Sequence, residues 1–323
     1  MSLWKLRGRM YLAVFLLFSL LFAFFSAIGF FAFRGTSFVL FSFVLSVSMI
    51  FLQFLLGPRI VGWSMKVKYV NESQEPRLHA MVDELSRQAN IPKPRVGVSE
   101  LPIPNAFAFG RWRSDGRVCV TRELMARVDE AELKGVLGHE LSHLKHRDVV
   151  FMMVLQVIPM VLYHIYLSLF WSSMFGGRDR NTGAAMAVAM LAFAVYFVSN
   201  LFVLYANRLR ELYADQGAIQ LTGERAPLAS ALYKIAYGSA RHKPQEIKSV
   251  EGCRALFLAD PATARRDVLD FRAADINRDG KIDEFELEAF SREPGKMSRS
   301  DRMMELFTTH PALVRRIRIL AQS

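Results

Sequence analysis

The chain has 323 residues, of which 52% are apolar and 22% are charged, and its formal net charge is +11. This apolar content excludes intrinsic disorder. With Cys119 and Cys253 as its two cysteines, the chain has neither a disulfide-stabilised scaffold nor a cysteine zinc site. High apolar content beside high charge indicates that the two kinds of residue lie in separate segments.

Two uncharged runs open the chain, at residues 10–33 and 36–57. Each is longer than the roughly 20 residues that a helix needs to cross the hydrocarbon core of a membrane. A cleaved signal peptide is the alternative for the first run, because basic residues precede it. The apolar region of such a peptide spans only about 7 to 15 residues, so we expect a retained transmembrane hairpin.

The next chemical signal is an H-E-x-x-H motif formed by His139, Glu140 and His143. Asp129 and Glu132 resemble a helix-start capping arrangement, and leucines follow at helical spacing. A helix places the two imidazoles on one face, where both can bind one zinc ion while Glu140 acts as general base. A chance match on an exposed helix is the alternative, expected in on the order of one per cent of chains this long.

Two further uncharged runs follow, at residues 149–175 and 183–206. Buried core helices are the alternative to a second transmembrane hairpin. Four spans would place 38 of the 41 basic residues on one side, which the positive-inside rule assigns to the cytoplasm. We therefore expect a multi-pass protein of the plasma or inner membrane, beside anionic lipid. The basic charge comes with no nucleic-acid recognition motif, so no nucleic-acid partner is expected.

A third metal ligand is expected just after the last of these runs, where Glu211 and Asp215 stand one helical turn apart. Glu211 would complete a set of two His and one Glu, and Asp215 could hold the outer nitrogen of a ligand His. A solvated acidic helix face is the alternative. If the two preceding spans are antiparallel neighbours, their cytoplasmic ends meet and bring the distant ligands together.

HELSH, the paired spans and NRLRELYAD at 207–215 together resemble the HtpX heat-shock zinc endopeptidases, which are related to the CAAX prenyl endopeptidases. Segments 104–110, 118–124 and 307–311 are similar too. The resemblance implies a mainly α, α+β integral membrane protein with four transmembrane helices and a gluzincin domain carrying a small edge sheet. It implies one zinc ion on His139, His143 and Glu211, with Glu140 as catalytic base. It also implies an edge strand that binds peptide substrate, with Asn105, Ala106, Phe107 and Ala108.

The chain departs from the family in a few places. Thr121, Arg122 and Glu123 stand where the family usually has small residues and glycine, and Asn207 replaces a common serine. His310 lies in a family-like segment, and we assign it no catalytic role from the sequence. The resemblance implies misfolded or damaged membrane proteins, or unfolded polypeptides, as substrates.

Residues 275–286, DINRDGKIDEFE, match the EF-hand loop pattern, which the resembling family does not usually contain. Gly280 supplies the sharp turn. The expected calcium ligands are the backbone carbonyl of Lys281 and the side chains of Asp275, Asn277, Asp279, Asp283 and Glu286. A solvated acidic loop is the alternative. EF-hands normally pair, so the alternatives for this single loop are weak binding, a structural role, or self-association through a second copy of the loop. Calcium control of proteolysis is a hypothesis.

The sequence therefore predicts a membrane-anchored zinc endopeptidase with a cytoplasmic catalytic domain. A CAAX prenyl endopeptidase-like protease is the nearest enzymatic alternative, and a proteolytically silent, calcium-binding membrane adaptor is the alternative of another class. In chain order we expect a transmembrane hairpin at 1–57, the first half of the protease domain at 58–148 and a second transmembrane hairpin at 149–206. The second half of the protease domain follows at 207–261, then an EF-hand insertion at 262–300 and the C-terminal part of the protease domain at 301–323.

Overall fold

The computed structural model describes residues 55–175, 182–242, 256–259, 263–264, 267–268, 274–292, 303 and 305–322. The expected hairpin of spans 10–33 and 36–57 lies outside these residues, apart from its last positions. Within the described residues the chain forms two compact units, one from 57–150 and 208–323 and the other from 151–207. Each unit is described by itself.

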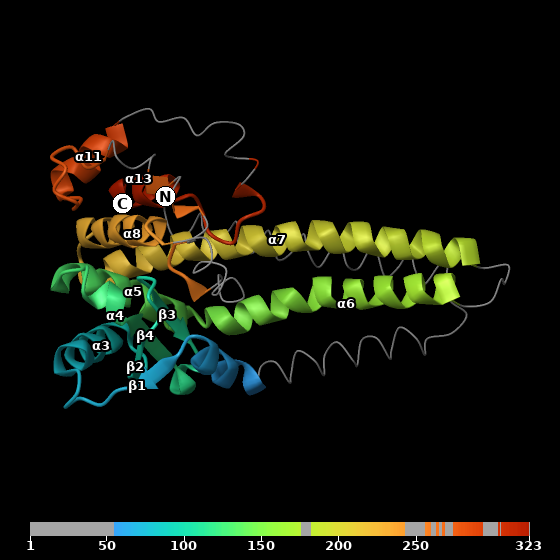
Figure 1. The fold of residues 1–323 in the computed structure, drawn as a ribbon, viewed down its shortest axis with the longest axis horizontal. Helices are drawn as coiled ribbons and strands as arrows, with labels where there is room; N and C mark the ends of the chain where they lie inside the picture. The colour runs from blue at the N-terminus through green and yellow to red at the C-terminus, as the bar shows by residue number, and fades with distance from the viewer. Residues whose placement is uncertain are drawn as a thin grey trace. The chain divides into compact units, whose positions relative to one another are not determined.

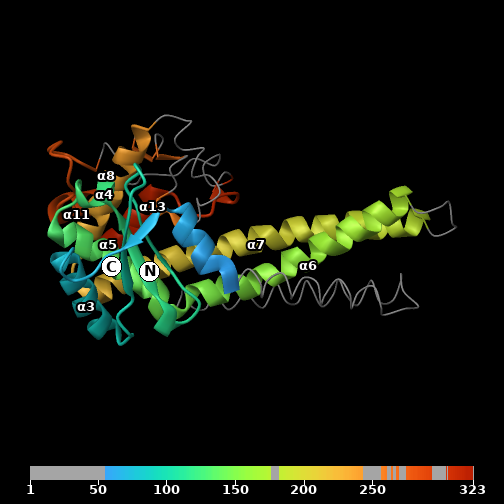
Figure 2. The same cartoon turned by 60° about the horizontal axis from the view of Figure 1, so that its bottom comes forward.

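A four-stranded sheet forms part of the first unit, in the order β1-β2-β4-β3. β1 (Val67–Tyr69) is antiparallel to β2 (Arg95–Ser99), which is parallel to β4 (Arg117–Thr121). β3 (Ala106–Phe109) is antiparallel to β4 and forms one edge of the sheet. Figures 1 and 2 show α3 (Pro76–Ala89) beside these strands. The expected small sheet is confirmed, and Ala106, Phe107 and Ala108 lie on its edge strand, whereas Asn105 precedes that strand.

The helix with the H-E-x-x-H motif, α5 (Glu130–His146), begins and ends where its sequence predicts. Asp129 caps it by accepting the Glu132 N–H at 3.0 Å, and the Glu132 carboxylate accepts the Asp129 N–H at 2.8 Å. This reciprocal pair satisfies two amides of the first turn. The helix ends at Arg147, whose φ is 56°. Its apolar side chains belong to the main core of the unit, namely Leu133, Val136, Leu137, Leu141 and Leu144.

Small residues let α5 lie very close to the last turns of α7 (Thr182–Thr222). A Cβ at Gly217 would lie 2.0 Å from Ser142 Oγ, and a Cβ at Gly138 would lie 3.3 Å from Thr222 Cγ2. Any larger residue at Gly217 would force the two helices apart. The close contact brings the carboxylates of α7 to the histidine face of α5.

The second unit contains α6 (Asp148–Phe175) from residue 151 onward and α7 up to residue 207. The two helices lie side by side in both views (Figures 1 and 2), and they share a core with Leu155, Leu162 and Ala192 among its members. Both are long and apolar enough to cross a membrane, by length and composition. The two helices expected at 149–206 are therefore present.

The C-terminal region shares the core of the first unit. Its helices are α8 (Ala226–Ala240), α11 (Glu284–Arg292) and α13 (Leu313–Ala321). Buried side chains of the EF-hand-like segment join the same core as α5 and α8, and these are Ile282, Leu287 and Phe290. This segment thus packs on α8 and α13, in the core to which the helix with the histidines also contributes.

Candidate metal centre

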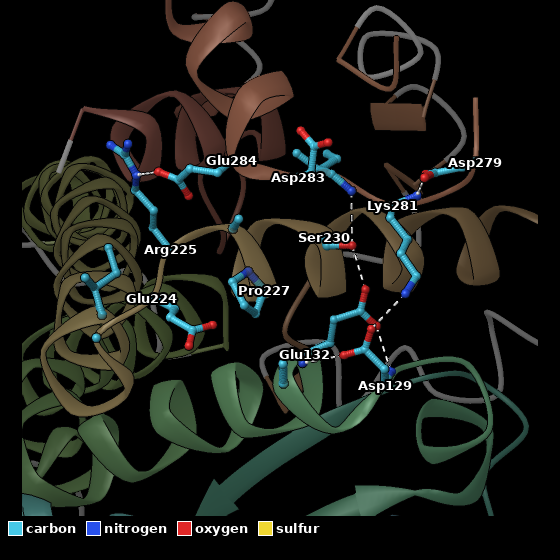
Figure 3. A pocket seen from close by; sticks show the side chains of 15 residues that line it. Asp129, Glu132, Glu224, Arg225, Pro227, Ser230, Asp279, Lys281, Asp283 and Glu284 are labelled. Atoms are coloured by element: carbon cyan, nitrogen blue, oxygen red, sulfur yellow. Dashed lines mark hydrogen bonds and ion pairs between the residues drawn. The ribbon is translucent and has the colours of Figure 1, made fainter. Parts of the chain in front are cut away.

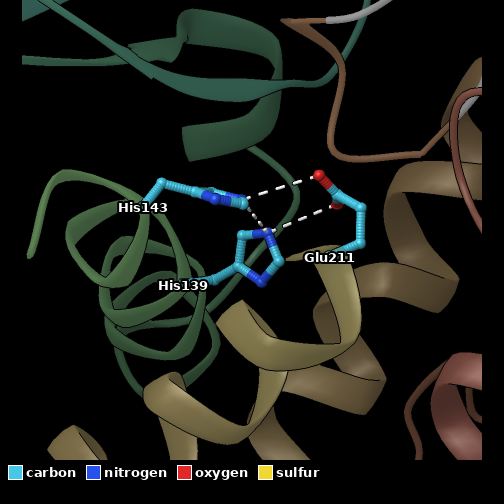
Figure 4. A group of neighbouring side chains, drawn as sticks. All are labelled: His139, His143 and Glu211. Carbon is cyan, nitrogen blue, oxygen red and sulfur yellow. Dashed lines mark hydrogen bonds and ion pairs between the residues drawn. The ribbon is translucent and has the colours of Figure 1, made fainter. Parts of the chain in front are cut away.

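Three donor side chains converge between α5 and α7 (Figure 4). The Nε2 atoms of His139 and His143 are 3.1 Å apart. Glu211 faces both rings, with 3.6 Å from Oε2 to His139 Nε2 and 3.6 Å from Oε1 to His143 Nε2. Tetrahedral zinc with bonds of about 2.1 Å has ligand atoms roughly 3.4 Å apart, so the spacing fits that ion.

The outer nitrogens of both rings face carboxylates. His139 Nδ1 lies 2.9 Å from Asp215 Oδ1, and His143 Nδ1 lies 2.6 Å from Asp148 Oδ2. A carboxylate at Nδ1 places the ring proton there, which leaves the Nε2 lone pair available as a ligand. Two imidazole nitrogens and the Glu211 carboxylate then face one point, an arrangement that a bound cation stabilises.

The charge of this site also favours a cation. His139 is fully buried, and burial by itself disfavours its charged form. The carboxylates of Asp215 and Glu211 outweigh that effect and raise the pKa of His139 to about 9. Among the described residues, these three side chains are the one group of His, Cys, Asp or Glu donors whose ligand atoms lie within 4.8 Å of one another. The site therefore fits a single zinc ion.

Each ligand histidine belongs to a buried relay that ends in an arginine. Arg316 of α13 donates from Nε and Nη2 to the two carboxylate oxygens of Asp215, at 2.9 and 2.6 Å. Arg210 of α7 lies 2.7 Å from Asp148 Oδ2. Both arginines are less than a tenth exposed. They compensate the buried carboxylates, which would otherwise be costly to keep charged.

The sequence identified Asp215 but missed the other members of these relays. Asp148 stands five residues after His143 at the start of the next helix, and this closeness in sequence could have indicated a contact with His143. Arg316 lies about a hundred residues from its partner in a basic C-terminal segment that reads as exposed. His310 was left without a role, and its Nδ1 lies 3.5 Å from Glu211 Oε2. The third histidine of α5, His146, bonds the Ser142 carbonyl of its own helix through Nδ1, at 2.8 Å.

Glu140 is buried next to the histidines, and burial raises its pKa against the opposing effect of His139 and His143. The backbone N–H of Ala108 on β3 also opposes this rise in pKa. An acid whose pKa is raised toward neutrality suits a group that must accept and return a proton. The edge strand thus contacts the expected general base directly.

Of the expected substrate-contacting residues, three lie on β3 and Asn105 directly precedes it. Asn105 is fully buried, and its side chain bonds the Leu256 carbonyl and the Leu258 N–H, both at 2.9 Å. Phe107 is also buried, in register with Cys119 of β4. Because Thr121 N–H bonds the Asn105 carbonyl at 2.9 Å, the alternating ladder directs the backbone of Ala106 and Ala108 to the free edge.

The EF-hand-like loop has the expected turn, with Gly280 at a φ of 81°. Asp275 is 6% exposed, and its Oδ1 has no hydrogen-bond partner among the described residues. Its Oδ2 accepts the Gly280 N–H at 3.1 Å, so the carboxylate faces into the loop. Glu286 Oε1 accepts the N–H groups of Ile276 and Asn277, at 2.9 and 3.1 Å. Calcium binding here remains a prediction.

A profile of peptidase family M48 matches residues 72–323. "Protease HtpX homolog" of Methanothermobacter thermautotrophicus is 45% identical over 256 residues, covering 79% of this chain and 95% of the relative. The protein with the same description from Moorella thermoacetica is 35% identical over 318 residues, covering 98% and 93%. The crystal structure of S. mikatae Ste24p is similar with a TM-score of 0.51 and 15% identity, over 98% of this chain and 66% of that one. This last likeness concerns the fold alone.

Proposed function

This chain belongs to peptidase family M48, and on that premise we propose that it is a zinc-dependent endopeptidase anchored in a membrane. One observation carries the proposal. Two imidazole lone pairs and the Glu211 carboxylate face one point, beside the buried carboxylate of Glu140. That arrangement matches a zinc site with two His and one Glu, which leaves a coordination position open for water.

The chemistry assigns separate tasks to the ion and to the protein. A zinc ion on His139, His143 and Glu211 would supply a Lewis acid and a water of lowered pKa. Glu140 accepts the proton of the attacking water and passes it to the amide nitrogen that leaves. The Ala108 N–H holds the Glu140 carboxylate beside the edge strand. Asp215 and Asp148 keep the rings of the two histidines oriented.

The free edge of β3 is the place where we propose that substrate binds, as an added strand. The available backbone groups are the N–H and C=O of Ala106 and the C=O of Ala108, because the Ala108 N–H already serves Glu140. Recognition through backbone groups tolerates many side chains. It suits unfolded segments of misfolded or damaged membrane proteins, the substrates we propose, with the catalytic domain on the cytoplasmic side.

The proposal is tested with the full-length protein in detergent. The wild type should carry one zinc ion per chain and cleave casein and an unprenylated membrane protein, while Glu140→Gln should retain zinc and lose the cleavage. A wild type without zinc, or equal turnover by both proteins, would overturn the proposal. Cleavage confined to prenylated substrates would favour the CAAX-type alternative.

We also propose that loop 275–286 binds one calcium ion. The support is the buried Asp275 carboxylate, which faces into the loop with one oxygen unpartnered, together with the positive φ of Gly280. Calcium titration of the purified protein, with Glu286→Gln as the control, tests this directly. Binding of calcium by a chain that neither holds zinc nor cleaves protein would favour the silent adaptor.

A further inference from the structure

The EF-hand-like loop contacts the first turn of the zinc-binding helix through the side chain of Lys281. Lys281 Nζ lies 3.0 Å from Asp129 Oδ2. Asp129 is the residue that caps α5, since its other oxygen accepts the Glu132 N–H at 3.0 Å. The ion pair therefore joins the loop to the cap of the helix that carries His139 and His143.

Ile282, the next residue of the loop, makes a second polar contact outside the loop. The Ile282 N–H donates to Ser230 Oγ at 3.2 Å, and Ser230 Oγ donates to Glu132 Oε1 at 2.6 Å. Glu132 is 2% exposed, and its Oε2 accepts from Lys234 Nζ at 2.7 Å and from the Asp129 N–H at 2.8 Å. Consecutive loop residues are thus connected to both members of the capping box, Lys281 directly to Asp129 and Ile282 through Ser230 to Glu132.

Figure 3 shows these contacts around a cavity of about 860 Å³. The Asp129 and Glu132 side chains come from the start of α5, Ser230 from α8, and Lys281 from the loop. Ile282 itself is buried in the core that α5 and α8 share. The loop is therefore anchored in the common core as well as joined to the helix start by polar contacts.

One peptide group connects the expected calcium position with the capping box. In an EF-hand the carbonyl at position 7 is a calcium ligand, and here that carbonyl belongs to Lys281. The N–H of the same planar peptide belongs to Ile282 and donates to Ser230. An ion that fixes the carbonyl therefore also fixes the direction of the N–H.

The negative charge of the loop would make its conformation respond to a bound cation. The four expected acidic calcium ligands, Asp275, Asp279, Asp283 and Glu286, lie within twelve residues. The unpartnered Oδ1 of Asp275 is buried inside the loop. A divalent cation would relieve the mutual repulsion of these carboxylates and pair the buried oxygen.

We infer that calcium in loop 275–286 stabilises the first turn of α5 through Lys281 and Ile282, and thereby strengthens zinc binding by His139 and His143. The inference rests on the proposed zinc endopeptidase function and names a regulator for it. Coupling between two sites is reciprocal, so bound zinc also strengthens calcium binding. The direction follows because the ion holds in place the residues that contact the cap.

The test measures zinc release from the full-length protein into a zinc chelator, with calcium absent or saturating, and calcium binding by calorimetry. In the wild type we expect calcium to slow zinc release about 5-fold or more, the lower end of typical allosteric coupling. Lys281→Met keeps the backbone carbonyl ligand but loses the ion pair with Asp129. It should still bind calcium while most of the effect on zinc release disappears.

Glu286→Gln is the matched control on the calcium side, and it should lose both calcium binding and the effect. Calcium that binds the wild type without changing zinc release would overturn the coupling. An effect of full size in Lys281→Met would exclude the route through Asp129. A wild type that binds no calcium would overturn the inference at its first step. Zinc content and calcium-free casein cleavage, measured on the same samples, report separately on the protease proposal.

Discussion

The two metal sites proposed for this chain are built in opposite ways. The zinc donors come from two helices, and each histidine is fixed by a carboxylate and an arginine contributed by other elements. The side-chain oxygens of the EF-hand-like loop come from twelve consecutive residues, and most of them accept hydrogen bonds from backbone N–H groups of the same loop. The first site is therefore preorganised by tertiary structure, whereas the second can adjust locally. Substitutions far from the zinc donors should weaken the zinc site strongly.

The largest effect is expected from Arg316→Met, which leaves Asp215 buried without its partner. Removing one member of a buried ion pair costs about 3–5 kcal/mol, so the free energy of unfolding should fall by that amount. Arg87→Met is the matched control, because Arg87 pairs with Asp83 at 3.2 Å and both side chains are exposed. Its loss should cost less than about 1 kcal/mol. Equal losses in denaturant titrations of the two variants would show that the Arg316 relay does not stabilise the centre.

Asp148→Asn tests whether the carboxylate that faces His143 also preorganises the zinc site. The amide keeps the shape of the carboxylate but holds the His143 ring less firmly, so zinc affinity should fall about 10–100-fold, as for other residues that orient a metal ligand. Competition with a chelator measures this affinity. Asp83→Asn, which removes an exposed pair with Arg87, should leave it unchanged. A zinc affinity in Asp148→Asn equal to that of the wild type would remove Asp148 from the relay.

A smaller effect is expected at Asp115, away from both motifs. Burial alone would raise its pKa, but the guanidinium groups of Arg111 and Arg117 lower it to about 2. A carboxyl with a depressed folded-state pKa stabilises the protein above its unfolded pKa, and this stabilisation disappears as pH falls through the folded value. Between pH 4 and pH 2, unfolding measurements should show wild type losing up to about 2 kcal/mol more than Asp115→Asn. Parallel pH profiles for the two proteins would contradict this assignment.

Local patterns in the sequence predicted much of the zinc centre. The cap at Asp129 and Glu132, the histidine face of one helix and the turn at Gly280 all depend on neighbouring residues, so the sequence displays them directly. Glu211 could be inferred because the two apolar runs between it and His143 suggested a hairpin. The edge position of residues 106–109 came from the family resemblance.

The remaining features depend on contacts between residues far apart in the chain. Arg316 reads as a surface residue until α13 is placed against Asp215. The side chain of Asn105 turned out to anchor residues 256–258, which local sequence cannot show. The parallel pairing of β2 with β4 and the contact of Ile282 with Ser230 likewise arise only when the core forms. No local pattern encodes such pairings.

The central claim, one zinc ion held by His139, His143 and Glu211, is tested most directly by zinc-edge X-ray absorption on the purified full-length protein. We predict one zinc ion per chain with two imidazole nitrogens and a carboxylate oxygen at about 2.0–2.2 Å, and loss of that signal in Glu211→Ala. Sulfur ligation, no zinc, or an unchanged spectrum in Glu211→Ala would contradict the account.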